Sequence, residues 1–394
     1  MSRTSGEVEK VEMWRKEHHT VSAGAEKMLS ISAISTSPLP THGGVVQWAK
    51  SERAFRRTRE SQVPPMPHRS AHITGWGYYV PERILTNADF ERMVDTSDEW
   101  ILTRTGIRER HIAAPGETSS VMATHAARKA LAQAGLDADD LDLILLGTCS
   151  ADYRTPSSAC LVQHALGAHC GALDLQAGCP GFLYALALGD QCIRGGSSRH
   201  VLVIGVEHLS PYVDYTDRSM CVLFGDGAGA VILSASEQPG GVRAFTLGSD
   251  GARPEVLWAP AGGGARPIGH AELDLGLQYV RMQGQEVFKF ATQISGPAIE
   301  AVLAQAGLCM EDIDLFIPHQ ANLRIIEAIA RRLKIPMEKM VVTVDRFGNT
   351  SASSIPIALC EAVADGRVRR GSRLMLVSFG AGLTWSAVLV EWTA

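Results

Sequence analysis

The chain has 394 residues, of which 45% are hydrophobic and 20% are charged, and its formal net charge is −5. A chain of this length can bury a sizeable core in one large or two medium domains, and the composition is ordinary for a soluble globular enzyme. The mild negative charge gives no basic surface of the kind that binds nucleic acid or an anionic membrane. No apolar run reaches the roughly 18 residues of a membrane span.

Residues 1–69 differ in composition and pattern from the rest of the chain. They carry eleven Lys and Arg against seven Glu, and proline-containing stretches interrupt them without a steady period of 2 or 3.6. They lack the apolar core of a signal peptide, and their early glutamates argue against a transit peptide. We expect a mostly disordered extension here. The alternatives are a regulatory or partner-binding tail and a translation start at Met66.

From His72 onward, short apolar runs alternate with helical patterns. The apolar runs predict buried strands at 141–150, 200–209, 230–236, 315–320, 373–382 and 386–392. The helical patterns lie at 120–135, 179–196, 294–307 and 352–366. Alternation of this kind predicts an α/β fold in which helices cover the sheets.

Two segments of the chain resemble each other at an offset of 172 residues. KALAQAGLDADDLDLILLGT (129–148) and AVLAQAGLCMEDIDLFIPHQ (301–320) align without a gap, with helix end, glycine, acidic loop and buried strand in the same register. The offset is far longer than the roughly 20–50 residues of a solenoid repeat. We therefore predict two similar α/β halves, residues 70–245 and 246–394, packed as one body.

The segment LDLQAGCPGFLYAL (173–186) places Cys179 where a predicted strand meets a predicted helix. Pro180 suits the first helical position, so the sulfur lies near unpaired N–H groups and the positive end of the helix dipole. Both favour the thiolate, which predicts a lowered pKa and a reactive sulfur. The alternative is a buried structural cysteine, the commoner case. The eight cysteines show no C-x-x-C pair and no metal-type spacing, which indicates reduced thiols in a cytoplasmic protein.

Two polar residues follow apolar runs or turns in the second half. His319 ends the predicted strand in IPHQANLRII, and Asn349 lies in a glycine-containing turn in VDRFGNTSASS. Ligands of open α/β sheets bind beyond the carboxyl ends of the strands, so we expect these residues to meet Cys179 there. Papain-like proteases also combine Cys, His and Asn at comparable spacing. Their C-G-S-C-W signature is missing, and the duplicated α/β pattern does not suit their fold.

Residues from about 70 to 394 closely resemble β-ketoacyl-acyl-carrier-protein synthase III, the initiating condensing enzyme of dissociated fatty-acid synthesis, in the thiolase superfamily. The motifs that carry the resemblance are TNADFERMVDTSDEWILTRTGIRERHIAAPGET (86–118), AGCPGF (177–182), FGDGAGA (224–230), PHQANLRI (318–325), DRFGNTSASS (345–354) and FGAGLTW (379–385). The resemblance implies a thiolase-like fold in which the two duplicated halves form a five-layered αβαβα body. The N-terminal half would carry the nucleophile and the C-terminal half the histidine and asparagine.

The resemblance also implies a reaction. Cys179 corresponds to the acyl-accepting nucleophile, and His319 and Asn349 to the pair that stabilises charge on the malonyl thioester oxygen. The backbone N–H groups of Cys179 and Ala381 would form the oxyanion hole. The implied activity is decarboxylative condensation of an acyl-CoA primer with malonyl-acyl-carrier protein, giving 3-oxoacyl-carrier protein, CoA and CO₂. No metal or cofactor is implied, since acyl-CoA is a substrate.

Residues that bind CoA are implied in the same way. Trp100 and Arg104 correspond to the pair that holds the adenine ring between an aromatic face and a planar guanidinium. Arg218 corresponds to a further arginine that contacts CoA, and Asn322 to a residue of the pantetheine channel. Thr96 is a weaker correspondence at the nucleotide end.

The remaining implied contacts involve protein partners. Arg324, Arg331 and Arg332 correspond to the basic patch that receives the acidic carrier protein, although arginines on a helix can simply face solvent. Thr155 falls where relatives restricted to short primers carry a phenylalanine that reaches the partner subunit's acyl pocket. A homodimer that accepts longer primers is therefore expected, with neither nucleic acid nor membrane as partner.

Two other functions on the same fold remain open. The first is a starter-unit or acyl-transfer enzyme of secondary metabolism. Such relatives often lack the histidine and asparagine that this chain retains. The other is a catalytically silent subunit, which the intact Cys179, His319 and Asn349 disfavour.

Overall fold

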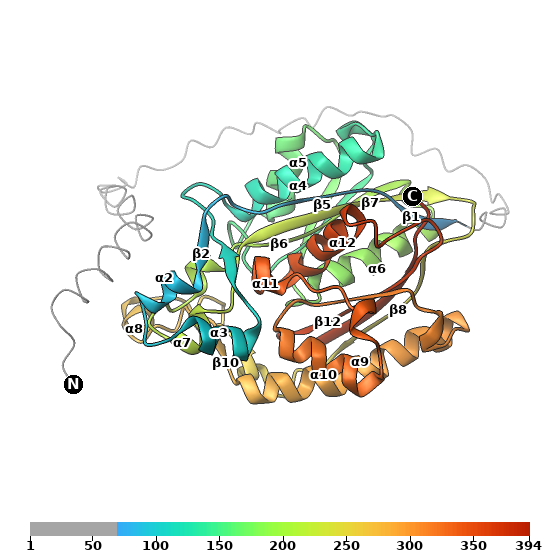
Figure 1. The fold of residues 1–394 in the computed structure, drawn as a ribbon. Helices are drawn as coiled ribbons and strands as arrows, with labels where there is room; N and C mark the ends of the chain where they lie inside the picture. Colours follow the sequence, from blue (N-terminus) through green and yellow to red (C-terminus); the bar gives the residue numbers. More distant parts are fainter. Residues whose placement is uncertain (1–68) are drawn as a thin grey trace, which may run out of the picture. The chain divides into compact units, whose positions relative to one another are not determined.

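The first half of the structure is built on a five-stranded sheet in the order β1-β7-β6-β4-β5 (Figure 1). The computed structural model describes residues 69–394, so the extension expected at 1–69 lies outside the described residues except for its last residue. Strands β4, β5 and β6 run parallel, and β1 and β7 run antiparallel to their neighbours. The strands are β1 Ser70–Tyr79, β4 Leu143–Gly147, β5 Gly171–Leu175, β6 His200–Glu207 and β7 Gly227–Ser236.

The second half repeats this arrangement with four strands in the order β11-β12-β13-β8. Strands β11 and β12 are parallel, whereas β13 is antiparallel to both β12 and β8. The strands are β8 Gly241–Ser249, β11 Leu315–Pro318, β12 Arg373–Gly380 and β13 Thr384–Glu391. The boundary predicted at 245/246 falls within β8, and this strand pairs along its length with the second sheet.

The internal repeat is visible in the element boundaries. The first half has helix α4 (Ser119–Ala134), then a 3₁₀ turn, then β4. The second half has the same order in helix α9 (Gly284–Ala306), a 3₁₀ turn and β11. The two helices end in the same residue type at the predicted offset of 172, and each is followed by a glycine with positive φ. The predicted duplication of α/β halves is confirmed.

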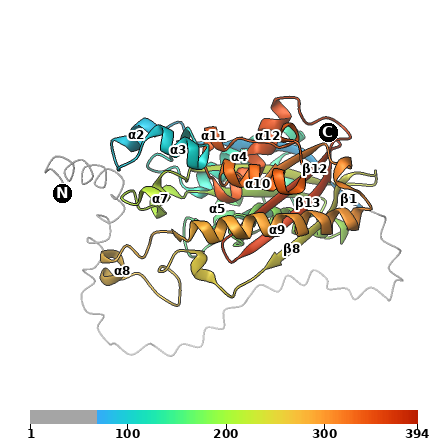
Figure 2. The ribbon, with the colours of Figure 1, turned by 60° about the horizontal axis from the view of Figure 1, so that its bottom comes forward.

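Helices and sheets alternate in five layers (Figures 1 and 2). Helices α4 and α5 (Ser158–Leu166) cover one face of the first sheet, and α6 (Gly181–Arg194) and α12 (Ser354–Ala364) lie between the two sheets. Helix α9 covers the outer face of the second sheet and packs against α10 (Leu323–Leu333). The fold class predicted from the sequence is therefore confirmed.

Glycines let the central helices approach the first sheet closely. A Cβ atom on Gly147 would lie 2.4 Å from the carbonyl carbon of Gly181, and one on Gly205 would lie 2.3 Å from the carbonyl oxygen of Ala352. Both contacts exclude any larger residue. They bring the segments that precede α6 and α12 to the ends of β4 and β6, where the candidate site lies.

Some elements differ from the prediction. Helix α9 begins at Gly284, ten residues earlier than expected, and contains Pro297. Pro180 is the N-cap of α6 rather than its first helical residue. The shorter elements are β2 Ile84–Thr86, α2 Asn87–Glu91, α3 Asp98–Thr105, β3 Glu109–His111, α7 Arg218–Cys221, β9 Leu257–Trp258, α8 His270–Asp274, β10 Arg281–Met282 and α11 Val344–Phe347. None of the helices in residues 69–394 is long and apolar enough to cross a bilayer.

Candidate active site

Cys179 lies in the turn between β5 and α6, packed against the segment that follows β12. The preceding Gly178 has φ of 61°, and a Cβ atom there would lie 2.7 Å from the carbonyl oxygen of Ala381. A Cβ atom on Gly380 would lie 2.8 Å from the backbone nitrogen of Cys179. The hydroxyl of Thr384 joins the two segments by donating to the carbonyl oxygens of Ala177 and Ala381, both at 2.8 Å. Because Gly178 and Gly380 have no Cβ atom, the segment that follows β12 can pack directly against Cys179.

Two backbone N–H groups act on the sulfur. Those of Cys179 and Ala381 both favour its thiolate form and so lower the pKa of the thiol. Paired backbone donors beside a nucleophile are the arrangement that stabilises a tetrahedral oxyanion. The geometry therefore supports the predicted oxyanion hole.

The predicted lowering of the Cys179 pKa is wrong for the unliganded protein. Burial raises the pKa of this thiol to about 11, although hydrogen bonds from Ser351, Cys179 and Ala381 act in the opposite direction. The side chain is only partly covered because the sulfur faces a cavity. Desolvation on the other sides of the sulfur raises the pKa more than the helix terminus and the hydrogen bonds lower it. Cys179 is therefore a thiol in the unliganded protein.

His319 follows β11 and is 1% exposed. Its Nδ1 lies 2.7 Å from Ser354 Oγ, which also accepts the backbone N–H of Gln320 at 3.3 Å. The serine hydroxyl can donate its proton to Nδ1, and in that arrangement the ring proton is on Nε2. Burial lowers the pKa of His319 to about 3, so the imidazole is neutral. A neutral imidazole with a proton on Nε2 is a hydrogen-bond donor toward the cavity.

Asn349 lies in the turn between α11 and α12. Its backbone N–H donates to Leu223 at 2.8 Å, and its carbonyl oxygen accepts from Gly225 at 3.1 Å. Its side-chain oxygen accepts the backbone N–H of Ser351 at 2.9 Å. The amide orientation is therefore fixed, and the NH₂ group remains as a donor.

One cavity of about 330 Å³ joins the three predicted catalytic residues. Cys179, His319 and Asn349 all line it, although they come from separate turns of the two halves. Most of the remaining wall is apolar, and it includes Leu223, Phe224, Val287, Ile325 and Phe379. The cavity can exclude water from a reacting acyl group while it offers the sulfur and a few placed donors.

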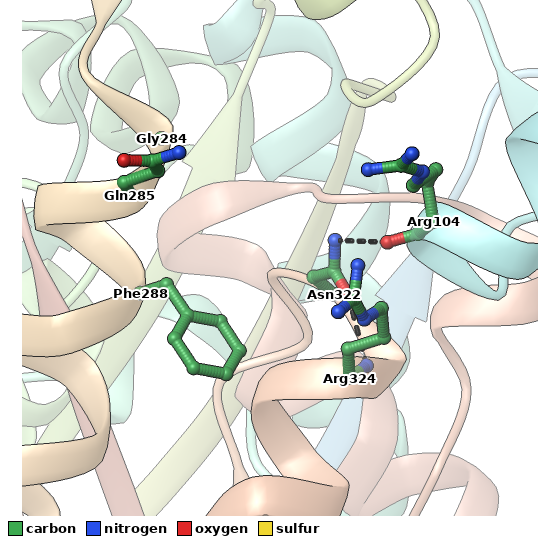
Figure 3. Close-up of a pocket in the computed structure, with 6 residues that line it drawn as sticks. All are labelled: Arg104, Gly284, Gln285, Phe288, Asn322 and Arg324. Atoms are coloured by element: carbon green, nitrogen blue, oxygen red, sulfur yellow. Dashed lines mark hydrogen bonds between the residues drawn. The ribbon is translucent and has the colours of Figure 1, made fainter.

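A second hollow of about 390 Å³ has several lining residues in common with this cavity. Figure 3 shows its walls, which come from the start of α9 on one side and from α3 and the start of α10 on the other. Asn322 caps α10 by accepting the backbone N–H of Arg324 at 2.8 Å, and its NH₂ group donates to the carbonyl oxygen of Arg104 at 3.0 Å (Figure 3). The lining residues are Arg104, Gly284, Gln285, Phe288, Asn322 and Arg324. The catalytic cavity therefore continues toward a polar region with two arginines.

The residues predicted to bind the nucleotide end of CoA gather at Trp100. The guanidinium of Arg218 lies 5.2 Å from the Trp100 ring centroid, and that of Arg104 lies 5.9 Å away. Arg218 also donates to the carbonyl oxygen of Asp95 at 2.7 Å. Thr96 is half-buried, and its hydroxyl finds no hydrogen-bond partner within residues 69–394. The structure thus brings together the aromatic ring and both arginines.

The residues predicted to bind protein partners do not line the catalytic cavity. Arg331 and Arg332 are exposed in the last turn of α10, and Arg324 is exposed in its first turn. Thr155 is exposed in the loop before α5 and does not line the cavity of its own chain. These positions are accessible to a second molecule.

Three groups around the site were not predicted from the sequence. Glu207 is fully buried at the end of β6, the Ser351 hydroxyl donates a hydrogen bond to Glu207, and Ser354 Oγ lies 2.7 Å from His319 Nδ1. Glu207 could have been found from the sequence, because it is a polar residue at the end of an apolar run, as His319 is. Within residues 69–394, no cluster of three or more His, Cys, Asp or Glu side chains has the arrangement of a metal site.

The chain is similar in sequence to one family of enzymes over most of its length. Residues 173–251 match 3-oxoacyl-[acyl-carrier-protein (ACP)] synthase III, and residues 303–392 match the C-terminal part described for the same enzyme. The β-ketoacyl-[acyl-carrier-protein] synthase III of Symbiobacterium thermophilum is 52% identical over 328 residues, which are 83% of this chain and 99% of that protein.

Solved structures agree with this relationship. The 3-oxoacyl-[acyl-carrier-protein] synthase III of Aquifex aeolicus is 47% identical with a TM-score of 0.76, covering 82% of this chain and all of that one. The priming β-ketosynthase of the R1128 polyketide biosynthetic pathway is 36% identical with a TM-score of 0.78, covering 84% and 99%. The chain therefore belongs to the β-ketoacyl-[acyl-carrier-protein] synthase III family, and it is an acyltransferase of the condensing-enzyme type.

Proposed function

We propose that the protein initiates fatty-acid synthesis by condensing an acyl-CoA primer with malonyl-acyl-carrier protein through an acyl-cysteine at Cys179. The products are 3-oxoacyl-carrier protein, CoA and CO₂. The observation that carries the proposal is the convergence of Cys179, His319 and Asn349 on one largely apolar cavity, with two backbone N–H groups at the sulfur.

Acylation comes first. The sulfur of Cys179 attacks the thioester carbonyl of the acyl-CoA, and the N–H groups of Cys179 and Ala381 hold the resulting oxyanion. The carbon–sulfur bond to CoA then breaks, and CoA leaves as its thiol. The acyl group remains on Cys179 in a cavity whose apolar wall shields it from water.

Condensation follows when malonyl-carrier protein replaces CoA. Loss of CO₂ leaves an enolate whose oxygen carries the developing negative charge. His319 and Asn349 each offer an N–H donor to that oxygen, and neither is charged. The enolate carbon attacks the acyl-cysteine, the Cys179 sulfur leaves as a thiolate, and a proton from water restores the thiol. Because decarboxylation itself generates the carbon nucleophile, the proposed reaction needs neither a metal nor an electron-sink cofactor.

The hollow beyond the catalytic cavity suits the CoA substrate. Trp100, Arg104 and Arg218 offer an aromatic face and two guanidinium groups to the nucleotide, and we assign Thr96 to the same end. Asn322 lines the path between this region and Cys179, as the pantetheine arm requires.

The carrier protein is assigned to the surface of α10. Arg324, Arg331 and Arg332 are exposed there, and the first of them borders the hollow that leads to the cavity. Exposed arginines attract an acidic partner and speed its encounter.

We also propose a homodimer in which Thr155 of each subunit faces its partner's acyl pocket. Strand β5 lies at the edge of the first sheet, and Leu173 within it is 40% exposed. An edge strand with unpaired backbone groups and exposed apolar side chains invites pairing with another chain. A molar mass of one chain in sedimentation equilibrium would contradict this assembly.

A starter-unit enzyme of secondary metabolism is the second candidate, since the R1128 priming ketosynthase has a similar structure. The higher identity to the synthases of Symbiobacterium thermophilum and Aquifex aeolicus favours fatty-acid synthesis. The reduced cysteines, none of which forms a disulfide within residues 69–394, suit a cytoplasmic site for this reaction.

The test is reconstitution with purified acyl-CoA and malonyl-carrier protein. We expect 3-oxoacyl-carrier protein, free CoA and CO₂ in equal amounts, with acetyl-CoA or a longer straight-chain ester as primer. Release of CoA without a new carbon–carbon bond would overturn the proposal. Activity only with unusual starter esters would favour the second candidate.

A further inference from the structure

Arg110 is a buried cation for which the proposed condensation has no assigned use. It is the middle residue of β3, pairs with Leu85 of β2 and is 0% exposed. Within residues 69–394, no ion pair joins it to a carboxylate. Burial lowers the pKa of Arg110 to about 10, so the guanidinium is still charged at neutral pH. An unpaired buried charge is costly, and an arginine at this position therefore needs an explanation.

An aromatic ring and two oxygen atoms stabilise the guanidinium of Arg110. Its central carbon lies 4.5 Å from the centroid of the Phe90 ring, within the range of a cation–π contact. Nη1 donates to Asn87 Oδ1 at 2.8 Å, and Nη2 donates to the carbonyl oxygen of Val222. The side chain therefore joins two segments that are far apart in the sequence.

Asn87 connects Arg110 to both ends of helix α3. Its side-chain NH₂ group donates to Oδ1 of Asp98, the first residue of the helix, at 2.8 Å. The same group donates to the carbonyl oxygen of Ile107, just beyond the end of the helix, at 2.9 Å. The bond from Arg110 occupies the amide oxygen and so fixes the orientation of the amide. Helix α3 carries the Trp100 ring.

Val222 connects Arg110 to helix α7. It is the C-cap residue of that helix, and Arg218 is the first helical residue. The guanidinium of Arg218 lies 5.2 Å from the centroid of the Trp100 ring. The two helices that Arg110 joins are therefore the two that meet at this ring, and their separation determines how the ring and the guanidinium face each other.

The segment after Val222, which lines the catalytic cavity, has anchors of its own. Asn349 donates its backbone N–H to the carbonyl oxygen of Leu223 at 2.8 Å and accepts from the backbone N–H of Gly225 at 3.1 Å. Neither bond involves Arg110. Loss of the guanidinium should therefore disturb the two helices more than the donor that Asn349 offers to the cavity.

We propose that Arg110 is a positioning residue that sets the separation of α3 and α7 and so aligns Trp100 and Arg218 for the nucleotide end of acyl-CoA. The proposal rests on the proposed function, in which these two residues bind CoA. Arg110 lines neither hollow and acts through Asn87 and Val222. The donors of a guanidinium lie in one plane at fixed angles, so they fix the distance between the two acceptors, which an ammonium group would not do.

The test compares acyl-CoA with the matching acyl-pantetheine in single acylations of the full-length protein, followed by intact mass. Acyl-pantetheine carries the same thioester without the nucleotide. Arg110→Met keeps an unbranched apolar chain and removes the guanidinium. We expect the half-saturating concentration of acyl-CoA to rise about tenfold, as for the loss of a cation–π contact, while the rate at saturation stays nearly constant. Acylation by acyl-pantetheine should not change, whereas general damage to the fold would slow both reactions.

Asn87→Asp tests the same connection from the side of α3. The aspartate still accepts from Arg110, but it can no longer donate to Asp98 and Ile107, so α3 loses its two bonds while the buried charge keeps a partner. We expect acyl-CoA to bind more weakly by a similar factor, again without a change for acyl-pantetheine. If Arg110→Met does not fold, this variant decides.

Arg194→Met is the matched control. Arg194 is a partly buried arginine of α6 that binds Asp190 and the carbonyl oxygen of Val242 and lines neither hollow. Its replacement should lower the thermal stability and leave acylation by both donors as in the wild-type protein.

A folded Arg110→Met or Asn87→Asp protein that uses acyl-CoA as the wild type does would overturn the proposal, as would an equal loss with both donors. A wild-type protein that uses both donors equally well would refute the nucleotide site, and the proposal with it. Absence of any acyl adduct from either donor on the wild-type protein would refute the proposed function as well.

Discussion

The side-chain oxygen of Asn349 accepts a hydrogen bond from the backbone N–H of Ser351 at 2.9 Å. Because the oxygen is used within the turn, the NH₂ group is the part of the amide left to face the cavity. The same turn gives Ser351 its positive φ and its hydrogen bond to Glu207. One short segment therefore holds both the NH₂ group that we assign to condensation and the hydroxyl that binds the buried Glu207.

The first prediction separates the two chemical steps. Asn349→Asp retains an acceptor for Ser351 but loses the NH₂ donor, so we expect Cys179 still to be acylated while malonyl decarboxylation falls by about 10²–10³-fold. We expect Asn349→Ala and His319→Ala also to retain acylation of Cys179 and to lose malonyl decarboxylation. Intact mass measures the first step, and CO₂ release from malonyl-carrier protein measures the second. Loss of acylation with normal decarboxylation would reverse the assigned roles.

The second prediction concerns pH and stability. The folded pKa of His319 is lowered to about 3, whereas the unfolded imidazole takes up a proton near pH 6.5. The resulting stability is present above pH 6.5 and is lost as the pH falls toward 3, by about 2 kcal/mol between pH 7 and pH 5. Urea unfolding at both pH values measures it, with His319→Gln as the control that lacks the titrating group. An equal pH dependence in both proteins would show that His319 is not held neutral.

The third prediction tests the nucleotide site. Trp100→Ala should raise KM for acyl-CoA about tenfold, since stacking and cation–π contacts contribute about 1 kcal/mol or more each, and it should change kcat little. KM for malonyl-carrier protein should stay constant. Trp258, which is 41% exposed and does not line either hollow, provides the matched control Trp258→Ala. A fall in kcat at constant KM would refute this assignment.

The fourth prediction concerns primer length. Thr155→Phe should lower kcat/KM for decanoyl-CoA far more than for acetyl-CoA, because the ring would fill the far end of the partner's acyl pocket. Each buried CH₂ contributes roughly 0.8 kcal/mol, so about four extra methylenes favour the longer primer by about 3 kcal/mol before entropy reduces it. Thr155→Val preserves side-chain size and should leave the preference intact. A wild-type enzyme that uses acetyl-CoA well and no longer ester would exclude the open pocket.

Much of the fold could be predicted because its signals are local. Central strands such as β6 are buried on both faces and show as continuous apolar runs, and the internal repeat appears as sequence identity. Strand β8 was missed because it is only partly buried and alternates irregularly. The start of α9 was misplaced because Gly296 and Pro297 suggest a helix boundary, whereas packing on the second sheet keeps the helix intact.

The site could be predicted only in part. Cys179 and His319 lie at ends of predicted elements, and the sequence marks such positions. The pKa of Cys179 could not be predicted, since it depends on how completely the two halves surround the sulfur. Ser351 could not be recognised either, because its hydroxyl is aimed by a backbone conformation that only the folded turn imposes.

The most direct measurement is the intact mass of the protein after incubation with acyl-CoA, for the wild-type chain and for Cys179→Ser. We predict that the wild-type protein gains the mass of one acyl group, that peptide mapping places it on Cys179, and that the serine variant gains none and forms no 3-oxoacyl-carrier protein. A serine hydroxyl is far less acidic and less nucleophilic than a thiol in the same position. A stable acyl adduct on the serine variant at another residue, with condensation retained, would contradict the account.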